Sequence, residues 1–352
     1  MADETRRLKS GNEEHHRHGV DPYTEFDEFD LPAYVGRTSF QKLLYVTDGD
    51  ALRAQRPDVA IVGAPFDDAV SHRPGARFGP RAIRAASYHA GTPNSLQLDI
   101  EPFEWLDVVD AGDAPITPAN MERSHTVIRR KVLEVAEAGA IPIVLGGDHS
   151  ITYPSASAVA EAVAPRRLGI VHFDAHADTA ANSWGVLNSH GTPMRRLLES
   201  GAVAGRNFVQ VGLRGYWPPP ETLAWMQRNG LRCHFMTEIE ERGAEAVVAD
   251  AIAEALDGPD SIYLSLDIDV VDPGLAPGTG TPEPGGMLSR EVLRAVRQIV
   301  SAVDLAGMDI VEVAPPYDWA ESTAMIANRA ALEAISALAV RRRDGTFKPR
   351  TG

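Results

Sequence analysis

The sequence has little of several features that define whole classes of protein. Its 352 residues include one cysteine, Cys233, so neither an intramolecular disulfide nor a four-cysteine zinc site can form within the chain. There is no run of about eighteen apolar residues, and residues 1–21 lack the apolar core of a signal peptide. We therefore expect a cytoplasmic protein with neither a membrane span nor a membrane partner.

Positive charge is also scarce. Lysine and arginine total 34 against 49 for aspartate and glutamate, which gives a formal net charge of −15. A chain this acidic repels phosphate backbones and anionic lipids, so we do not expect a nucleic-acid partner. The charge is compatible with small cationic ligands. Hydrophobic residues still make up 44% of the chain, which is enough for one large core.

The first part of the chain differs in composition from the rest. Residues 1–37 are polar, and we expect them to form an N-terminal extension. Three histidines lie there without acidic or cysteine partners at metal-ligand spacing, and we expect them to be solvated: His15, His16 and His18. No internal repeat or linker divides the chain beyond residue 37. The sequence thus predicts a single domain over 38–345 and a short tail over 346–352.

Short apolar runs rich in valine and isoleucine alternate with longer segments of helical spacing. Several runs are apolar without alternation, which is typical of strands buried on both faces. The expected strands are Val59–Gly63, Trp105–Val109, Pro142–Leu145, Leu168–His172, Phe208–Val211, Arg232–Phe235, Ser261–Leu266 and Met308–Val311. Repeated strand–helix alternation predicts an α/β fold with a parallel sheet covered by helices on both faces.

Two of the intervening segments show a clear helical stripe. In the first, apolar residues from Met121 to Val135 share one face, and Thr117 is the expected N-cap, with Pro118 at the first helical position. Gly139 would close this helix. The second stripe begins at Val248 and ends before Asp257-Gly258.

Polar residues gather immediately after three of the expected strands, where ligands bind in open α/β sheets. The segments are Gly146–Ser150, Phe173–Asp178 and Asp267–Asp269. Asp174, His176 and Asp178 are spaced by two, so an extended backbone would point all three side chains the same way. Alone, each segment has a structural alternative, such as a tight turn in which Asp148 caps the following helix.

Together, the three segments predict a metal site. Four aspartates cannot be buried close together unless a cation neutralises them, and two divalent ions carry the matching charge. His149 and His176 complete a set of nitrogen and oxygen donors that suits Mn²⁺ and also Fe, Ni, Co or Zn. Two such ions, roughly 3.5–4 Å apart, would bridge a water molecule and lower its pKa.

These motifs resemble those of the ureohydrolase family, which includes arginase and agmatinase. The matching segments, spread from about residue 60 to about 330, are Arg73–Pro80, Gly146–Ser150, Asp174–Asp178, Ser189–Pro193, Ser265–Pro273, Ala276–Pro282 and Val311–Pro315. The resemblance implies a three-layer α/β/α fold around a mainly parallel eight-stranded sheet. It also implies a homo-oligomer, either a trimer or a hexamer.

The resemblance further implies two Mn²⁺ ions per subunit, with Ni²⁺ as an alternative. One ion would be held by His149, Asp174, Asp178 and Asp267, and the other by Asp174, His176, Asp267 and Asp269. Asp178 would orient the bridging hydroxide and pass its proton to the leaving amine, His190 would shuttle protons to solvent, and Glu312 would pair with the substrate guanidinium. The alternatives are a surface histidine at 190 and a structural salt bridge at 312.

The expected reaction is hydrolysis of a guanidino compound, a linear amidine, to urea and an amine. The Ser189–Pro193 segment resembles that of agmatinase-like members, which implies agmatine as substrate and putrescine as product. Met194 stands where agmatinases commonly carry phenylalanine, and Trp184 and Leu187 make the preceding loop bulky. Hydrolysis of 4-guanidinobutyrate, 3-guanidinopropionate or free guanidine therefore stays open.

Other functional classes fit the motifs less well. In a metallophosphoesterase the Asp-x-His motif would come first, but here Gly147-Asp148-His149 precedes it and no Gly-His-x-His follows. A deacetylase would need adjacent histidines, which occur only in the polar N-terminal stretch. An inactive metal-binding homologue is the remaining alternative, and only an activity measurement separates it from an enzyme.

Overall fold

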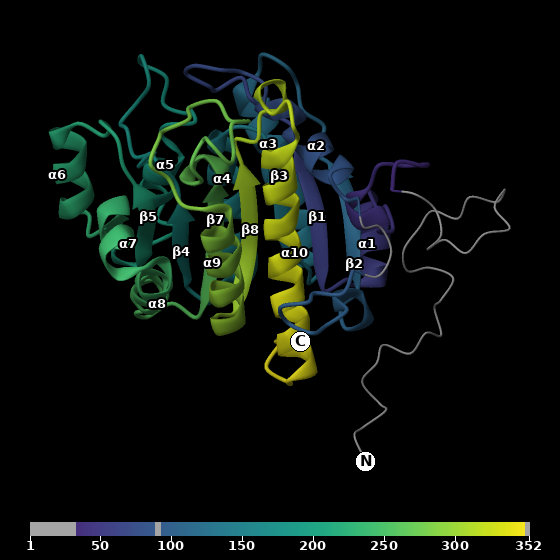
Figure 1. The fold of residues 1–352 in the computed structure, drawn as a ribbon. Coiled ribbons are helices and arrows are strands. Elements are labelled where there is room, and N and C mark those ends of the chain that lie inside the picture. Colours follow the sequence, from purple (N-terminus) through teal and green to yellow (C-terminus); the bar gives the residue numbers. More distant parts are fainter. Residues whose placement is uncertain (1–32, 89–92, 349–352) are drawn as a thin grey trace, which may run out of the picture.

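The computed structural model describes residues 33–88 and 93–348, so the three histidines of the N-terminal extension lie outside the described residues. Eight parallel strands form one sheet in the order β2-β1-β3-β8-β7-β4-β5-β6 (Figure 1). The strands are β1 (Val59–Ala64), β2 (Val108–Asp113), β3 (Ile141–Gly146), β4 (Leu168–Phe173), β5 (Phe208–Leu213), β6 (Arg232–Phe235), β7 (Ser261–Asp267) and β8 (Leu305–Val311). The parallel sheet predicted from the sequence is confirmed.

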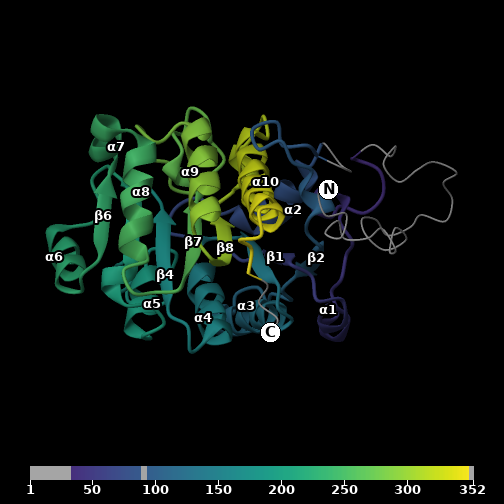
Figure 2. The ribbon, with the colours of Figure 1, turned by 90° about the horizontal axis from the view of Figure 1, so that it is seen from below.

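Helices cover both faces of the sheet, which gives three layers (Figure 2). One layer contains α2 (Gly79–Ala85), α7 (Met236–Arg242), α8 (Ala244–Ala255), α9 (Ser289–Ala302) and α10 (Ser322–Arg343). The other contains α1 (Gly49–Gln55), α3 (Met121–Glu137), α4 (Thr152–Val163) and α5 (Pro193–Glu199), while α6 (Pro220–Arg228) lies beyond the β6 edge.

The strands are buried on both faces because each side of the sheet packs against its own helix layer. In β1, Val59 and Ile61 belong to the hydrophobic core beneath α8, α9 and α10, whereas Ala60 and Val62 belong to the core beneath α3 and α4. All six residues of β1 are buried. This two-sided burial explains why the strand sequences are apolar without alternation.

The predicted strand Trp105–Val109 is misplaced, because β2 begins at Val108 and runs to Asp113. The backbone N–H groups of Trp105 and Leu106 instead donate to the carbonyl of Pro102, which closes a turn before the strand. The second half of β2 contains Asp110 and Asp113, so it is not recognisable as an apolar strand. Both carboxylates pair with Arg84, which is far away along the sequence, and no local pattern predicts this contact.

The predicted start of α3 is also wrong. Asn120, not Thr117, is the N-cap, and its Oδ1 accepts a hydrogen bond from the backbone N–H of Arg123 at 3.0 Å. The Thr117 backbone is tied to the Ser124 hydroxyl instead. Asparagine and threonine both cap helices, so the two candidates could not be separated by residue type. Gly139, at φ +90°, follows the helix end as expected.

Two features bear on expectations from composition. Among the described helices, α10 alone has the length and hydropathy to cross a membrane, but 72% of the relevant window is buried inside the fold, as in the core helix of a soluble domain. The thiol of Cys233 lies 3.6 Å from Gln210 Oε1, and burial raises its pKa to about 12.

The buried arginine at the end of β2 allows a stability prediction. Arg84, 5% exposed, donates to both carboxylate oxygens of the fully buried Asp110 at 2.7 and 2.9 Å. Arg84→Met would leave this carboxylate without its cation, so we expect a loss of about 3–5 kcal/mol in the free energy of unfolding. Urea denaturation measures this loss.

The control is Arg53→Met, which removes an exposed arginine paired with Asp50. Water and salt screen an exposed pair so that it contributes little to stability, and this variant should therefore unfold almost like the parent. Equal effects of the two substitutions would contradict the interpretation of Arg84.

Candidate metal centre

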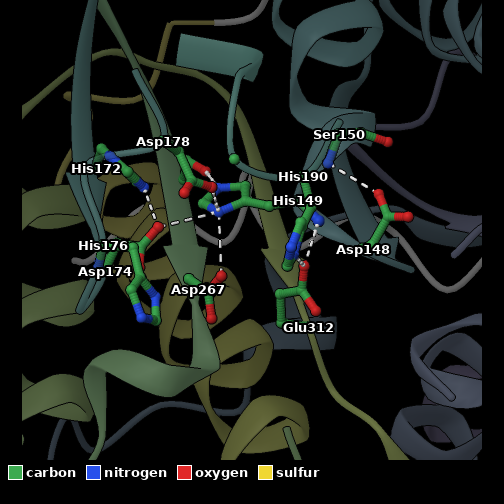
Figure 3. A network of polar contacts seen from close by, with 12 residues as sticks. Asp148, His149, Ser150, His172, Asp174, His176, Asp178, His190, Asp267 and Glu312 are labelled. Atoms are coloured by element: carbon green, nitrogen blue, oxygen red, sulfur yellow. Dashed lines mark hydrogen bonds and ion pairs between the residues drawn. The ribbon is translucent and has the colours of Figure 1, made fainter. Parts of the chain in front are cut away.

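The order of the strands brings the predicted site residues together. The neighbouring strands β3, β8, β7 and β4 end at the same edge of the sheet. His149 follows β3, Glu312 follows β8, Asp267 ends β7 and Asp174 follows β4. Figure 3 shows their side chains pointing toward one another. Residues from distant parts of the sequence thus meet in one buried cluster.

One half of the cluster is centred on His149. Its Nδ1 atom lies 3.1 Å from Asp174 Oδ2, 3.0 Å from Asp178 Oδ2 and 3.0 Å from Asp267 Oδ2 (Figure 3). His149 is fully buried, and Asp178 is the most exposed of its three partners. One nitrogen therefore faces three carboxylate oxygens from two different strand ends.

The other half is centred on His176. Its Nδ1 atom lies 3.0 Å from Asp269 Oδ2 and 3.4 Å from Asp174 Oδ1. Asp174 therefore presents one oxygen to His176 and the other to His149. All six residues predicted as ligands lie in this one cluster, with Asp174 between its two halves.

The spacing of Asp174, His176 and Asp178 predicted an extended backbone that points all three side chains the same way, and this prediction is wrong. Residues 174–178 follow the end of β4 rather than continuing it, and Asp178 has a left-handed backbone with φ +51°. Two of the carboxylates stabilise the turns that follow them. Asp174 Oδ1 accepts from His176 N at 2.6 Å, and Asp267 Oδ1 accepts from Asp269 N at 2.8 Å. The direction of these side chains is therefore set by the turns after the strands and not by alternation along a strand.

Asp148 has the structural role that was the alternative for its motif. Its carboxylate accepts from the backbone N–H groups of Ser150 and Ala69, both at 2.9 Å. It caps the short helical turn that carries His149 and fixes the loop after β1.

The electrostatics of the cluster call for a cation. Burial, together with Asp269 and Asp174, raises the pKa of Asp267. Burial opposes protonation of His176, but Asp269 and Asp174 outweigh it and raise the histidine pKa to about 12. Both shifts share a cause, which is that buried negative charge in the cluster favours a positive charge beside it.

The donor set fits divalent metal ions. His149 Nδ1 is buried and makes no well-oriented hydrogen bond, although three carboxylate oxygens lie around it. One N–H can serve only one of these oxygens well, whereas a metal ion binds nitrogen and oxygen donors together. The residues of a binuclear metal site are present.

His172, which the sequence did not single out, lies in the same cluster. With His149 and Asp174 it forms one of the groups of side chains close enough to share an ion. Gln210 Nε2, which also donates to the Ala177 carbonyl, donates to His172 Nδ1 at 3.0 Å. The proton of His172 is therefore on Nε2, which donates to Asp174 Oδ2 at 2.9 Å. His172 orients Asp174 rather than offering a lone pair.

The two remaining predicted residues contact each other. His190 Nδ1 lies 3.0 Å from Glu312 Oε1, which also accepts from the backbone N–H of His149 at 2.8 Å. Glu312 Oε2 is buried and has no hydrogen-bond partner. Burial lowers the pKa of His190, but Glu312 outweighs this effect and raises it to about 9.

Ser71, in the loop after β1, is a further contact that the sequence did not reveal. Its backbone N–H donates to His190 Nε2 at 3.0 Å, and its hydroxyl lies 2.7 Å from the same nitrogen. Ser71 is exposed, so His190 connects buried Glu312 with the surface. A single serine in a loop carries no pattern that could have identified it.

A cavity of about 530 Å³ opens onto the cluster. His176, Asp178, His190 and Asp267 line it, together with two tryptophans from outside the cluster. Trp184 is 85% exposed and Trp217 is 60% exposed. No lysine or arginine is among the lining residues in the described part of the chain.

Comparisons with known proteins agree with this geometry. The model of the arginase family matches residues 57–336. Proclavaminate amidinohydrolase of Streptomyces clavuligerus is 40% identical over 280 residues, which cover 79% of this chain and 87% of that protein. Its solved structure has a TM-score of 0.79 at 35% identity, covering 88% of this chain and 99% of that one.

Two further relatives differ in the substrates that their names give. Guanidinopropionase of Pseudomonas aeruginosa is 38% identical over 314 residues, covering 89% of this chain and 95% of that protein. Mitochondrial agmatinase of Gallus gallus is 38% identical over 324 residues, covering 92% of this chain and 90% of that protein.

The position of Asp174 between both halves of the cluster leads to a test. In Asp174→Asn one carboxylate is lost from both halves, so we expect the chain to lose most of its bound Mn²⁺ after reconstitution, not half of it. Elemental analysis of the dialysed protein measures the content.

Asp318→Asn is the matched control, because Asp318 is also buried but caps α10 through the N–H groups of Thr323 and Ala324. Asparagine keeps one of the two acceptor oxygens, and Asp318 is not part of the cluster, so this variant should keep its metal. Full metal content in Asp174→Asn would contradict the shared position of this carboxylate.

Proposed function

The chain belongs to the arginase family and is a ureohydrolase of a guanidino compound; we propose that this compound is agmatine, hydrolysed to putrescine and urea. The observation that carries the proposal is the unpartnered, buried Oε2 of Glu312 beside the cluster. A buried carboxylate oxygen without a partner is costly, and a guanidinium would supply the missing donor.

We assign the ligands in two overlapping sets: His149, Asp174, Asp178 and Asp267 for one ion, and Asp174, His176, Asp267 and Asp269 for the other. The contacts around the two Nδ1 atoms support this division. When bound, two divalent ions supply the nucleophile, because they lower the pKa of bound water toward neutrality. Mn²⁺ is the proposed metal, and Ni²⁺ is compatible with the same donors.

The chain's own side chains bind and orient the substrate and move protons. Glu312 would hold the guanidinium and thereby fix the position of its carbon. Asp178 lines the cavity and contacts His149 Nδ1, and it would take the proton of the nucleophile and deliver it to the leaving amine.

His190 is suited to exchange protons with solvent. In the neutral ring, Nε2 accepts from the Ser71 backbone N–H and Nδ1–H donates to Glu312. A second proton would convert the ring to imidazolium between Glu312 and exposed Ser71. With a pKa of about 9 this charged ring is favoured at neutral pH, and the neutral ring forms when the Nε2 proton leaves.

The mouth of the cavity supports agmatine over guanidino acids. The faces of indole rings attract ammonium groups, and Trp184 and Trp217 are the exposed aromatic residues there. Among the described lining residues, no cationic side chain pairs with a substrate carboxylate. The second candidate is a guanidino acid such as 4-guanidinobutyrate, since Asn182 and Ser183 also line the cavity and offer neutral donors.

A substrate panel tests the proposal. Urea release is measured with agmatine, 4-guanidinobutyrate, 3-guanidinopropionate and guanidine, after loading with Mn²⁺ and with Ni²⁺ in parallel. We expect the highest kcat/KM with agmatine and no urea after exhaustive chelation. In Trp184→Leu the KM for agmatine should rise about 2–30-fold, the range of a cation–π contact. In Trp319→Leu, which removes an exposed tryptophan outside the cavity lining, it should not.

A preference for 4-guanidinobutyrate would replace agmatine by the second candidate. Urea release that survives chelation would rule out the metal-dependent reaction. Release from none of the compounds would leave the inactive homologue as the better interpretation.

The role of His190 is tested separately. In His190→Asn we expect turnover to fall about 10²–10⁴-fold, the usual contribution of a proton-transfer group, while metal content stays near that of the parent. His176→Asn is the comparison, because it should lose metal and turnover together. If His190→Asn lost both in the same proportion, His190 would support the ligands instead of moving protons.

A further inference from the structure

Asp309, in β8, is a buried carboxylate that the proposed reaction does not use. It is 0% exposed, and its two oxygens accept hydrogen bonds from the Tyr263 and Ser265 hydroxyls, both at 2.7 Å. No lysine, arginine or histidine in the described part of the chain forms an ion pair with it. A charge buried with only hydroxyl partners needs compensation from elsewhere.

With Asp309 ionised, as an acceptor of both hydroxyl protons, the directions of the hydrogen bonds that lead from it to His149 follow. The Ser265 hydroxyl has one proton, and it donates that proton to Asp309 Oδ1. The same Ser265 oxygen lies 3.0 Å from His149 Nε2. Because the serine proton is already used, His149 must be the donor in this contact. His149 therefore carries a proton on Nε2.

The protonation of Nε2 decides what His149 offers at its other nitrogen. In the neutral ring, a proton on Nε2 leaves the lone pair on Nδ1. Nδ1 is the atom that faces Asp174, Asp178 and Asp267. A lone pair directed at three carboxylate oxygens is tolerable only with a cation between them.

We propose that Asp309 is a positioning residue for the metal centre: through Ser265 it holds His149 in the tautomer that offers Nδ1 to the metal. An amide in place of this carboxylate can donate its NH2 to Ser265, and the serine proton would then turn to His149 Nε2, which would favour the tautomer with Nδ1 protonated and the metal excluded. Tyr263 donates to the other oxygen of Asp309 and forms no hydrogen bond with His149. The inference rests on the proposed metal centre and is independent of the guanidino substrate.

The test compares Mn²⁺ affinities, measured by competition with a fluorescent chelator, in variants along this chain of contacts. In Asp309→Asn and in Ser265→Ala we expect a 10–100-fold weaker affinity, which is typical when the partner of a ligating histidine is removed. Ser265→Thr keeps a hydroxyl and should restore most of the affinity. Tyr263→Phe is the matched control, because it removes the other partner of Asp309 and leaves the link to His149, so its affinity should stay within about threefold.

The double variant Asp309→Asn/Ser265→Ala shows whether Asp309 acts through Ser265. We expect it to bind Mn²⁺ no more weakly than Asp309→Asn alone, because two substitutions in one relay are not additive. A second signature is the exchange-protected Nε2–H proton of His149 in the NMR spectrum of the Zn²⁺-loaded parent, which should shift in Ser265→Ala.

Parent-like affinity in Asp309→Asn, equal losses in Asp309→Asn and Tyr263→Phe, or additive losses in the double variant would overturn the proposal. If Asp309→Asn fails to fold, the pair Ser265→Ala and Ser265→Thr decides, since equal affinities in that pair would also overturn it. A parent that binds no Mn²⁺ would overturn this inference together with the metal centre. A parent that binds Mn²⁺ but releases no urea would refute only the proposed reaction.

Discussion

Five carboxylates share a small volume at one edge of the sheet, and their mutual repulsion is the constraint around which the rest of the site is arranged. Three neighbouring strands, β4, β7 and β8, deliver Asp174, Asp178, Asp267, Asp269 and Glu312 to this edge. Backbone N–H groups fix several of these carboxylates, as when His149 N donates to Glu312 and Ala175 N to Asp269. Such fixed carboxylates cannot move apart to relieve the repulsion, so the cluster keeps a high affinity for positive charge.

The surrounding fold provides the rigidity that this arrangement needs. Each of the four central strands is buried on both faces, and the helix layers are anchored to separate hydrophobic cores. Hydrogen-bond chains then extend the order outward from the cluster, from Asp174 through His172 to Gln210 and from His149 through Ser265 to Asp309. A ligand whose partner is itself held by a partner has little freedom to reorient.

The sequence predicted the parallel sheet and the grouping of the site residues because both leave local patterns: continuous apolar runs, and acidic and histidine residues directly after them. Prediction from the sequence failed where the bounds of an element or the direction of a side chain depends on residues far apart along the chain. The start of β2 depends on Arg84 and the turn at Pro102, and the aim of Asp178 depends on a left-handed backbone. Ser71 could not be recognised because its contact is with His190, far along the chain, and Asp309 could not because it reaches His149 only through Ser265.

The single thiol of the chain has a practical consequence. Cys233 is partly buried, and its thiol donates a hydrogen bond to Gln210. Burial raises the pKa of this thiol to about 12, which leaves almost no thiolate to react with alkylating agents or peroxide. We therefore expect this thiol to react slowly with alkylating agents and oxidants. The protein also provides a silent background for chemical labelling, so that a cysteine introduced near Trp184 could carry a reporter dye at the entrance to the cavity.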